Sequence, residues 1–123
     1  SFGANDCHLE NGAPRVSQAG TLKNAQAMLT EAGARCPVLL IGPPPVVDPG
    51  VSARLEGLNE TLKVLAARLK VPFIDVFQPL AADGLWREEA AAWDGAHPGA
   101  GGYQRMADLV GAHPAWRAFT LID

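Results

Sequence analysis

The sequence predicts an α/β fold built around parallel strands. Two short aliphatic runs alternate with segments of helical periodicity, an order that is typical of strands joined by helical crossovers. The 123 residues fit one domain, and Gly and Pro cluster between the periodic segments, as expected of short connections. Hydrophobic residues make up 48% and charged residues 19%, so an intrinsically disordered chain and a coiled coil are both disfavoured.

A first helix is expected over residues 16 to 34. Apolar residues recur there at three- and four-residue spacing, Ser17 suits the N-cap, and Gly33 suits the C-terminal stop. The stripe consists of Leu22, Ala25, Leu29 and Ala32. A buried strand is expected next, over residues 37 to 42, because the run Val38 to Ile41 is aliphatic and the three prolines after it cannot donate ladder hydrogen bonds.

The strongest periodicity lies in residues 49 to 70 and predicts an amphipathic helix. Its apolar stripe consists of Leu55, Leu58, Leu62, Leu65 and Leu69. A second strand is expected over residues 71 to 77, an irregular segment over 78 to 97, and a helix over 98 to 111 with Pro98 in its first turn.

Two strands are too few for a parallel sheet that buries both faces. We therefore expect residues 1 to 123 to be the C-terminal part of a larger α/β domain, with further strands before Ser1.

Composition limits the partners. The net charge is -3 and the chain has no run of Lys or Arg, so nucleic acid is a poor candidate. The longest uninterrupted aliphatic run, Val38 to Ile41, is far below the ~18 apolar residues of a membrane span. No secretory signal is visible at Ser1, and the two cysteines, Cys7 and Cys36, are expected to be free thiols, so a cytoplasmic location is favoured.

The segment from Trp93 to Pro98 can carry chemistry. Asp94 precedes His97 by three residues through a glycine turn, so its carboxylate can accept a hydrogen bond from imidazole Nδ1 and leave Nε2 free as a general base. Taken alone, this spacing is more typical of a carboxylate and a histidine that cap a turn and a helix.

The segment Gly3-Ala4-Asn5-Asp6 is a second candidate. Glycine permits a tight turn, from which the side-chain NH₂ of Asn5 can donate to a developing oxyanion. Alone, an ordinary Asx turn is the more common explanation.

The two segments, in this order and separated by a strand with a Gly-Pro-Pro loop, resemble the later sequence blocks of the SGNH hydrolases, also called the GDSL esterase and lipase family. Gly3-Ala4-Asn5-Asp6 is similar to the G-x-N-D block, and Asp94-Gly95-Ala96-His97-Pro98 is similar to the D-x-x-H-P block. The resemblance implies a three-layer α/β/α sandwich with a parallel sheet, flavodoxin-like in layout, of which this chain is the C-terminal portion.

The resemblance also implies roles. His97 would be the general base, Asp94 its orienting carboxylate, and Asn5 the side-chain donor of the oxyanion hole, with Gly3 shaping the substrate-binding loop around Asn5. Asp6 would steady the turn. No metal and no cofactor are implied, and the expected substrate is a small ester.

The chain departs from the family pattern at the nucleophile. The family's G-D-S block and the block of its backbone-donating glycine are absent, and none of the three serines is assigned as the nucleophile. Ser17 and Ser52 lie near predicted helix starts, where capping is expected to account for them, and Ser1 precedes the Asn5 block. The preceding N-terminal segment, or another copy of the chain, is therefore an expected partner.

Three candidate functions are compared. The leading one is a serine ester hydrolase of SGNH type, in which this chain alone is inactive; the alternative is a non-catalytic protein of the same fold that serves in binding. A metal-assisted hydrolase would draw ligands from Asp6, Cys7, His8, Asp94 and His97, but their spacing fits no common metal motif. Trp86 and Trp93 suit either a pocket wall or the core, and His113 is expected in a loop.

Overall fold

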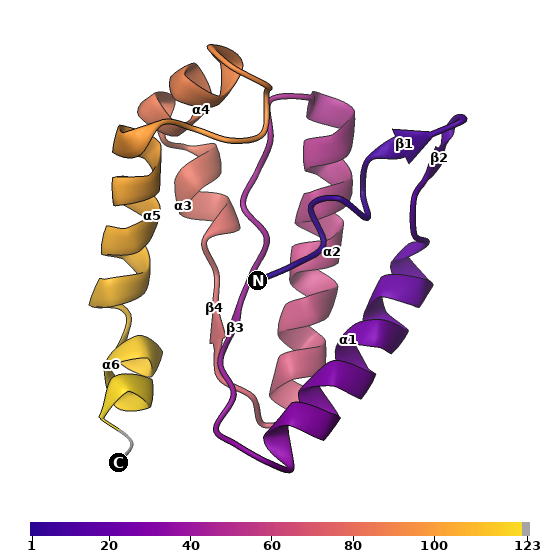
Figure 1. Ribbon diagram of the computed structural model, residues 1–123, viewed down its shortest axis with the longest axis vertical. Helices are drawn as coiled ribbons and strands as arrows, with labels where there is room; N and C mark the ends of the chain where they lie inside the picture. The colour runs from indigo at the N-terminus through magenta and orange to yellow at the C-terminus, as the bar shows by residue number, and fades with distance from the viewer. Residues whose placement is uncertain (122–123) are drawn as a thin grey trace.

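The computed structural model describes residues 1–121, as a mixed α/β fold with most of its chain in helices (Figure 1). The elements in chain order are β1 (Leu9–Glu10), β2 (Ala13–Pro14), α1 (Gln18–Gly33), β3 (Leu40–Ile41), α2 (Pro49–Arg68), β4 (Phe73–Ile74), α3 (Phe77–Ala81), α4 (Gly84–Ala91), α5 (Ala100–Ala112) and α6 (Pro114–Thr120).

Strands β3 and β4 pair in parallel, with Leu40 opposite Phe73 and Ile41 opposite Ile74. The pairing continues where Gly42 N donates to Ile74 O at 2.9 Å. Both strands thus lie within the predicted ranges, 37 to 42 and 71 to 77, but each is shorter than predicted. Prolines at both ends of the first run have no N–H to donate, which limits the ladder.

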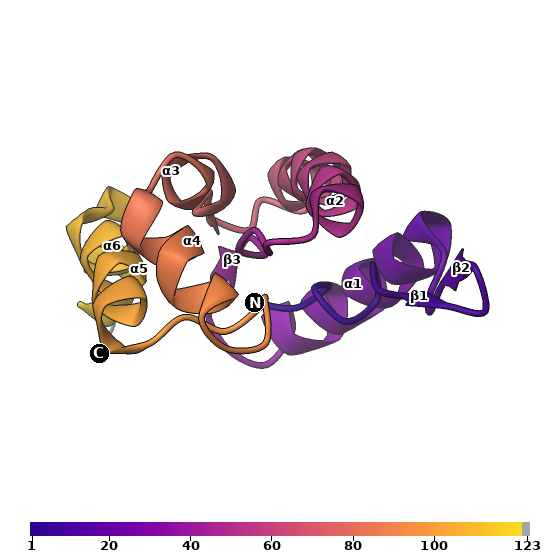
Figure 2. The same cartoon turned by 90° about the horizontal axis from the view of Figure 1, so that it is seen from above.

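The apolar residues of the strand pair alternate between two cores. Leu40 packs with α1 and α2, whereas Leu39 and Ile41 pack with Ile74, Trp86 and Val110. Because successive side chains of a strand point to opposite faces, helices cover both faces of the pair. Figure 2 shows this arrangement from above, with α1 and α2 on one side of β3 and α5 and α6 on the other. A three-layer sandwich around a complete parallel sheet stays a prediction.

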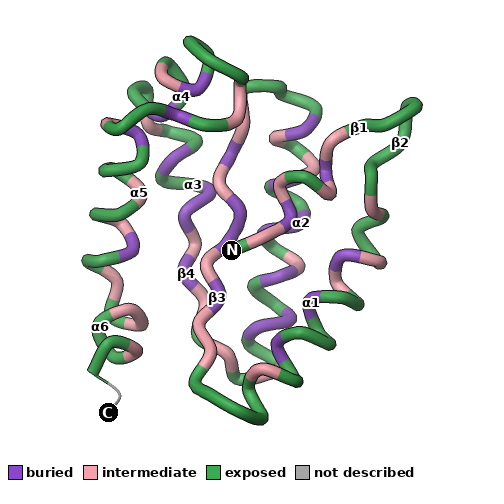
Figure 3. Tube along the Cα trace, in the orientation of Figure 1, coloured by how far each residue is buried: buried purple, intermediate pink, exposed green. Residues whose placement is uncertain are grey.

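Helix α2 forms where the leucine stripe predicts it. Asp48 caps it by accepting from Val51 N at 2.7 Å, so Ser52 lies inside the helix and the expectation that it caps the helix start is wrong. Ser17 does cap α1, accepting from Gly20 N at 3.1 Å. Buried positions follow the inner side of α2 and the strand pair, as Figure 3 shows.

Two expectations about local structure are wrong. Residues 78 to 97 are largely helical, because α3 and α4 occupy them and Trp86 and Ala90 anchor α4 in the core. Pro98 precedes α5 and lies outside its first turn. His113 does lie in the short connection between α5 and α6, as expected, and its Nδ1 accepts from Ala115 N at 3.1 Å, which caps α6.

A small antiparallel hairpin, β1 with β2, was not predicted from the sequence. Its turn contains Asn11 and Gly12, both at positive φ. An Asn-Gly pair is a common signal for such a turn, but two-residue strands carry no detectable alternation. Both cysteines are free, as predicted; Cys7 is buried and Cys36 is exposed. No helix within residues 1–121 is long and apolar enough to cross a membrane.

Candidate active site

The Asp94 to His97 turn follows directly from the end of α4. Trp93 N and Gly95 N both donate to Ala90 O, at 3.2 and 2.8 Å, and Gly95 adopts a φ of +80°. Glycine has no Cβ penalty in this left-handed region, so the chain can reverse sharply between Asp94 and His97.

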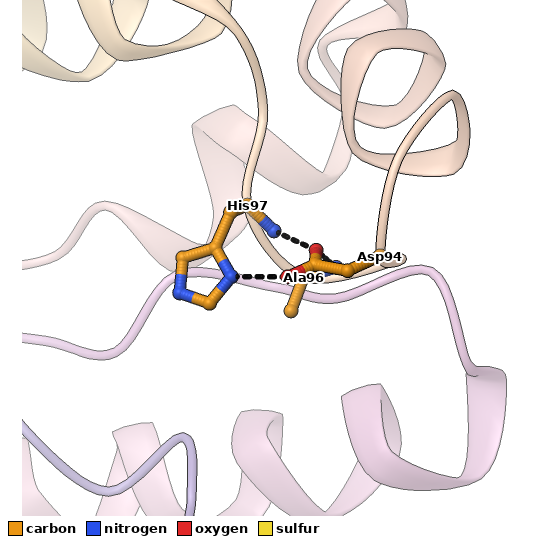
Figure 4. A network of polar contacts seen from close by, with 3 residues as sticks. All are labelled: Asp94, Ala96 and His97. Carbon is orange, nitrogen blue, oxygen red and sulfur yellow. Dashed lines mark hydrogen bonds and ion pairs between the residues drawn. The ribbon is translucent and has the colours of Figure 1, made fainter.

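One carboxylate organises the whole turn (Figure 4). Asp94 Oδ1 accepts from Ala96 N at 2.9 Å and from His97 N at 2.8 Å, and Asp94 Oδ2 lies 2.7 Å from His97 Nδ1. The turn cap and the imidazole contact, which the sequence left as alternatives, are both present. They use different oxygens of the same side chain.

The hydrogen bonds lower the pKa of Asp94 to about 2, first through the backbone N–H of His97, then through that of Ala96 and through the imidazole. Asp94 is therefore ionised at neutral pH and can only accept hydrogen bonds. Because of this, Nδ1 of His97 carries the proton of a neutral imidazole, and Nε2 keeps a free lone pair. The side chain of His97 is 59% exposed, so that lone pair can reach a reacting group.

The turn is anchored to the loop that follows β3. Val47 N donates to Gly95 O at 2.7 Å. This loop leaves the carboxyl end of β3, the edge at which open α/β sheets bind their ligands. The Val47 contact has no signal in the sequence, because Val47 and Gly95 lie far apart in the chain.

The chain just before the Asn5 segment also contacts the start of this loop. Ser1, two residues before Gly3, donates from its Oγ to Gly42 O at 3.2 Å, so the residue that leads into the Asn5 segment contacts the same loop that Val47 joins to Gly95 (Figure 1). Gly3 is buried with a φ of +109°, and a Cβ at Gly3 would lie 2.6 Å from Leu58 Cδ2. A glycine is thus required where the chain turns toward Asn5.

Asn5 itself is exposed. Its backbone oxygen accepts from His8 N at 3.3 Å, which closes the turn, and no hydrogen bond joins its side chain to His97 within residues 1–121. The adjacent Asp6 accepts from the buried Thr21 hydroxyl at 2.8 Å. Asp6 therefore steadies the segment. That the Asn5 side chain faces His97 stays a prediction.

Trp86 and Trp93 have different surroundings. Trp86 is buried, and its Nε1 donates to Pro45 O at 3.1 Å, so it belongs to the core. Trp93 is 75% exposed, and its ring centroid lies 5.9 Å from that of His97. Only Trp93 is placed to touch a group bound at the imidazole.

The part of the chain that the structure describes holds no cluster of three or more His, Cys, Asp or Glu side chains that could bind a metal. A cavity of about 990 Å³ lies between α1 and α2, and neither Asn5 nor His97 lines it. No serine hydroxyl within residues 1–121 bonds to His97, whose side-chain partner is Asp94.

The chain is similar to known proteins over most of its length. The family model described as GDSL-like Lipase/Acylhydrolase matches residues 1–105. The crystal structure of a lipase/acylhydrolase from Enterococcus faecalis is 27% identical, with a TM-score of 0.71, over 89% of this chain and 55% of that one. A GDSL-like lipase from Bacteroides thetaiotaomicron VPI-5482 is 25% identical, with a TM-score of 0.71, over 89% of this chain and 57% of that one. No curated protein sequence matches. The chain thus spans just over half the length of these two solved proteins.

Proposed function

This chain belongs to the GDSL-like lipase/acylhydrolase family, and we propose that it supplies the general base and one oxyanion donor of a serine ester hydrolase. The observation that carries the proposal is the 2.7 Å contact between Asp94 Oδ2 and His97 Nδ1. An ionised carboxylate on Nδ1 orients an imidazole whose Nε2 is free, which is the arrangement that activates a serine hydroxyl.

The reaction proceeds by acyl transfer. The serine oxygen attacks the carbonyl carbon of the ester as His97 Nε2 takes the hydroxyl proton, and the Asn5 side-chain NH₂ donates to the oxygen that gains negative charge. The imidazolium, stabilised by Asp94, then gives its proton to the leaving alkoxide, which departs as an alcohol. Water, deprotonated by the same Nε2, attacks the acyl carbon; the imidazolium then returns its proton to the departing serine oxygen, and the acid is released.

The nucleophile of this proposal lies outside residues 1–123. Ser17 is occupied as a helix cap, Ser1 donates to the Gly42 carbonyl, and Ser52 lies within α2; none of these three hydroxyl groups bonds to His97. We assign the reactive serine to an N-terminal segment of the same protein, with another copy of the chain as the second source. The substrate class is a small ester.

A non-catalytic member of the same family is the competing function. Such a protein would need the fold but not the bond between Asp94 and His97. An exposed imidazole held by a carboxylate with a pKa of about 2 serves no purpose in packing, which favours the hydrolase.

Labelling with a fluorophosphonate tests the proposal, because this probe reacts with an activated serine hydroxyl. The protein as its gene encodes it is expected to gain one adduct by intact mass, and His97→Ala is expected to abolish it. His113→Ala, which removes the helix cap of α6, is the matched control and should keep the adduct. The 123-residue chain alone should stay unlabelled; an adduct on it would place the nucleophile among Ser1, Ser17 and Ser52.

A further inference from the structure

Helix α5 begins immediately after the candidate base and lacks a capping side chain of its own. Its N-cap is Gly99, which makes no side-chain hydrogen bond. The first N–H groups of a helix have no partner within the helix, so they must be satisfied from elsewhere. The position of α5 matters because its first residue, Ala100, lies three residues after His97.

The missing cap comes from α4. Glu89 Oε2 accepts from Gly102 N at 2.6 Å. Gly102 is the third residue of α5, the position whose N–H an N-cap side chain commonly binds. A carboxylate at this point also interacts favourably with the positive end of the helix dipole.

The glycines at the start of α5 leave room for this carboxylate. A Cβ on Gly99 would lie 3.2 Å from Glu89 Oε2, and one on Gly101 would lie 2.7 Å from Glu89 Oε1. A Cβ on Gly102 would lie 2.4 Å from Pro98 Cβ, the residue next to His97. The first turn of α5 is therefore packed directly against Glu89 and Pro98, with no space for side chains between them.

Glu89 thereby joins the two ends of the catalytic turn. The chain enters the turn from α4, where the carbonyl of the neighbouring Ala90 accepts from Trp93 N and Gly95 N, and leaves it into α5, which Glu89 holds. We propose that Glu89 is a positioning residue that fixes the His97 backbone so that Nδ1 meets Asp94. This inference rests on the proposed role of His97 as base.

Nitrogen-15 NMR of the His97 imidazole, recorded on the protein as its gene encodes it, tests the inference without an assay of activity. The wild type is expected to show the Nδ1–H tautomer of His97, with a downfield Nδ1 proton bonded to Asp94. Glu89→Ala should lose the downfield proton and mix the tautomers, while Glu89→Gln, whose side-chain oxygen can still accept from Gly102 N, should restore both. Glu88→Ala removes an exposed carboxylate one residue away and should leave both signals unchanged.

Should Glu89→Ala fail to fold, Glu89→Asp carries the same test, since it keeps the charge and withdraws the carboxylate by one methylene. Its downfield proton should weaken and its Gly102 amide resonance should shift. In a complete enzyme, Glu89→Ala is expected to lower kcat by about 10- to 100-fold with little change in KM, as for other losses of alignment.

A failure of the positioning role and a failure of the proposed function would give different NMR results. A wild-type signal with Nδ1–H bonded to Asp94 that persists in folded Glu89→Ala or Glu89→Asp would overturn the positioning role and leave the proposed function standing. A wild type in which Nδ1 carries no proton toward Asp94 would remove the basis of the proposed function and, with it, the inference.

Discussion

Asp94 binds His97 twice, once through each carboxylate oxygen: Oδ2 lies 2.7 Å from the imidazole Nδ1, and Oδ1 accepts from the backbone N–H of His97 at 2.8 Å. The side chain that bonds to the imidazole Nδ1 therefore also shapes the turn that carries His97. Because each oxygen has its own partner, one substitution of Asp94 can disturb the orientation of the imidazole alone, whereas another also disrupts the turn.

Asp94→Asn is expected to keep the turn and lose the orientation. The amide oxygen of Asn can accept from the two backbone N–H groups, but its NH₂ cannot accept from Nδ1, so the imidazole adopts the other tautomer. We expect kcat of the complete enzyme to fall by up to about 10⁴-fold with little change in melting temperature. Asp94→Ala should lower both kcat and the melting temperature. Equal kcat values for wild type and Asp94→Asn would refute the orienting role.

The side chain of Asn5 is expected to act only in the transition state. Asn5→Ala should lower kcat by about 10²- to 10³-fold and leave KM nearly unchanged, by comparison with the loss of other single oxyanion donors. Asn24→Ala, on the exposed side of α1, is the control and should behave as wild type. A KM effect without a kcat effect would place Asn5 in substrate binding and take it out of the oxyanion hole.

Gly3 is expected to tolerate no side chain. Gly3→Ala would force a φ of +109° on a residue with a Cβ and bring that Cβ within 2.6 Å of Leu58 Cδ2, so we expect a loss of about 1 to 3 kcal/mol of unfolding free energy. Gly57→Ala is the matched control, because Gly57 lies inside α2 with nothing within 4 Å of a Cβ. That control should gain about 0.5 to 1 kcal/mol. Urea unfolding of both variants measures the difference, and equal midpoints would show that the turn is not constrained.

The carboxyl group of Asp94 is expected to titrate far below its ordinary value. Its folded pKa is lowered from 3.8 to about 2, so its contribution to stability is present above pH 3.8 and is lost as the pH falls through about 2. The ¹³C resonance of the Asp94 carboxyl should therefore show a midpoint near pH 2. A midpoint at the ordinary value would mean that the three hydrogen bonds are not formed in solution.

The regular helices could be predicted from the sequence because their own periodicity defines them. The leucine stripe places α2 at residues 49 to 70, and the structure has it at Pro49–Arg68. Helices α4 and α6 are eight and seven residues long, too short for a periodic pattern, and depend on packing and on the caps at Asp83 and His113. The sequence does not show that packing.

The candidate site was predictable where it is local. The Asp94 to His97 contact spans three residues, so a turn signal suffices to suggest it. The bonds of Val47 to Gly95 and of Glu89 to Gly102 join separate elements, and neither Val47 nor Glu89 stands in a recognisable motif. Contacts of this kind depend on the tertiary fold, so the supports of the turn could be found only in the structure.

Turnover of p-nitrophenyl acetate by the protein as its gene encodes it tests the central claim most directly, namely that His97 is the base of an ester hydrolase. The predicted result is measurable hydrolysis that His97→Ala reduces to the background rate, while His113→Ala keeps the wild-type kcat/KM. Hydrolysis that persists unchanged in His97→Ala would contradict the account, because the reaction would then use another base.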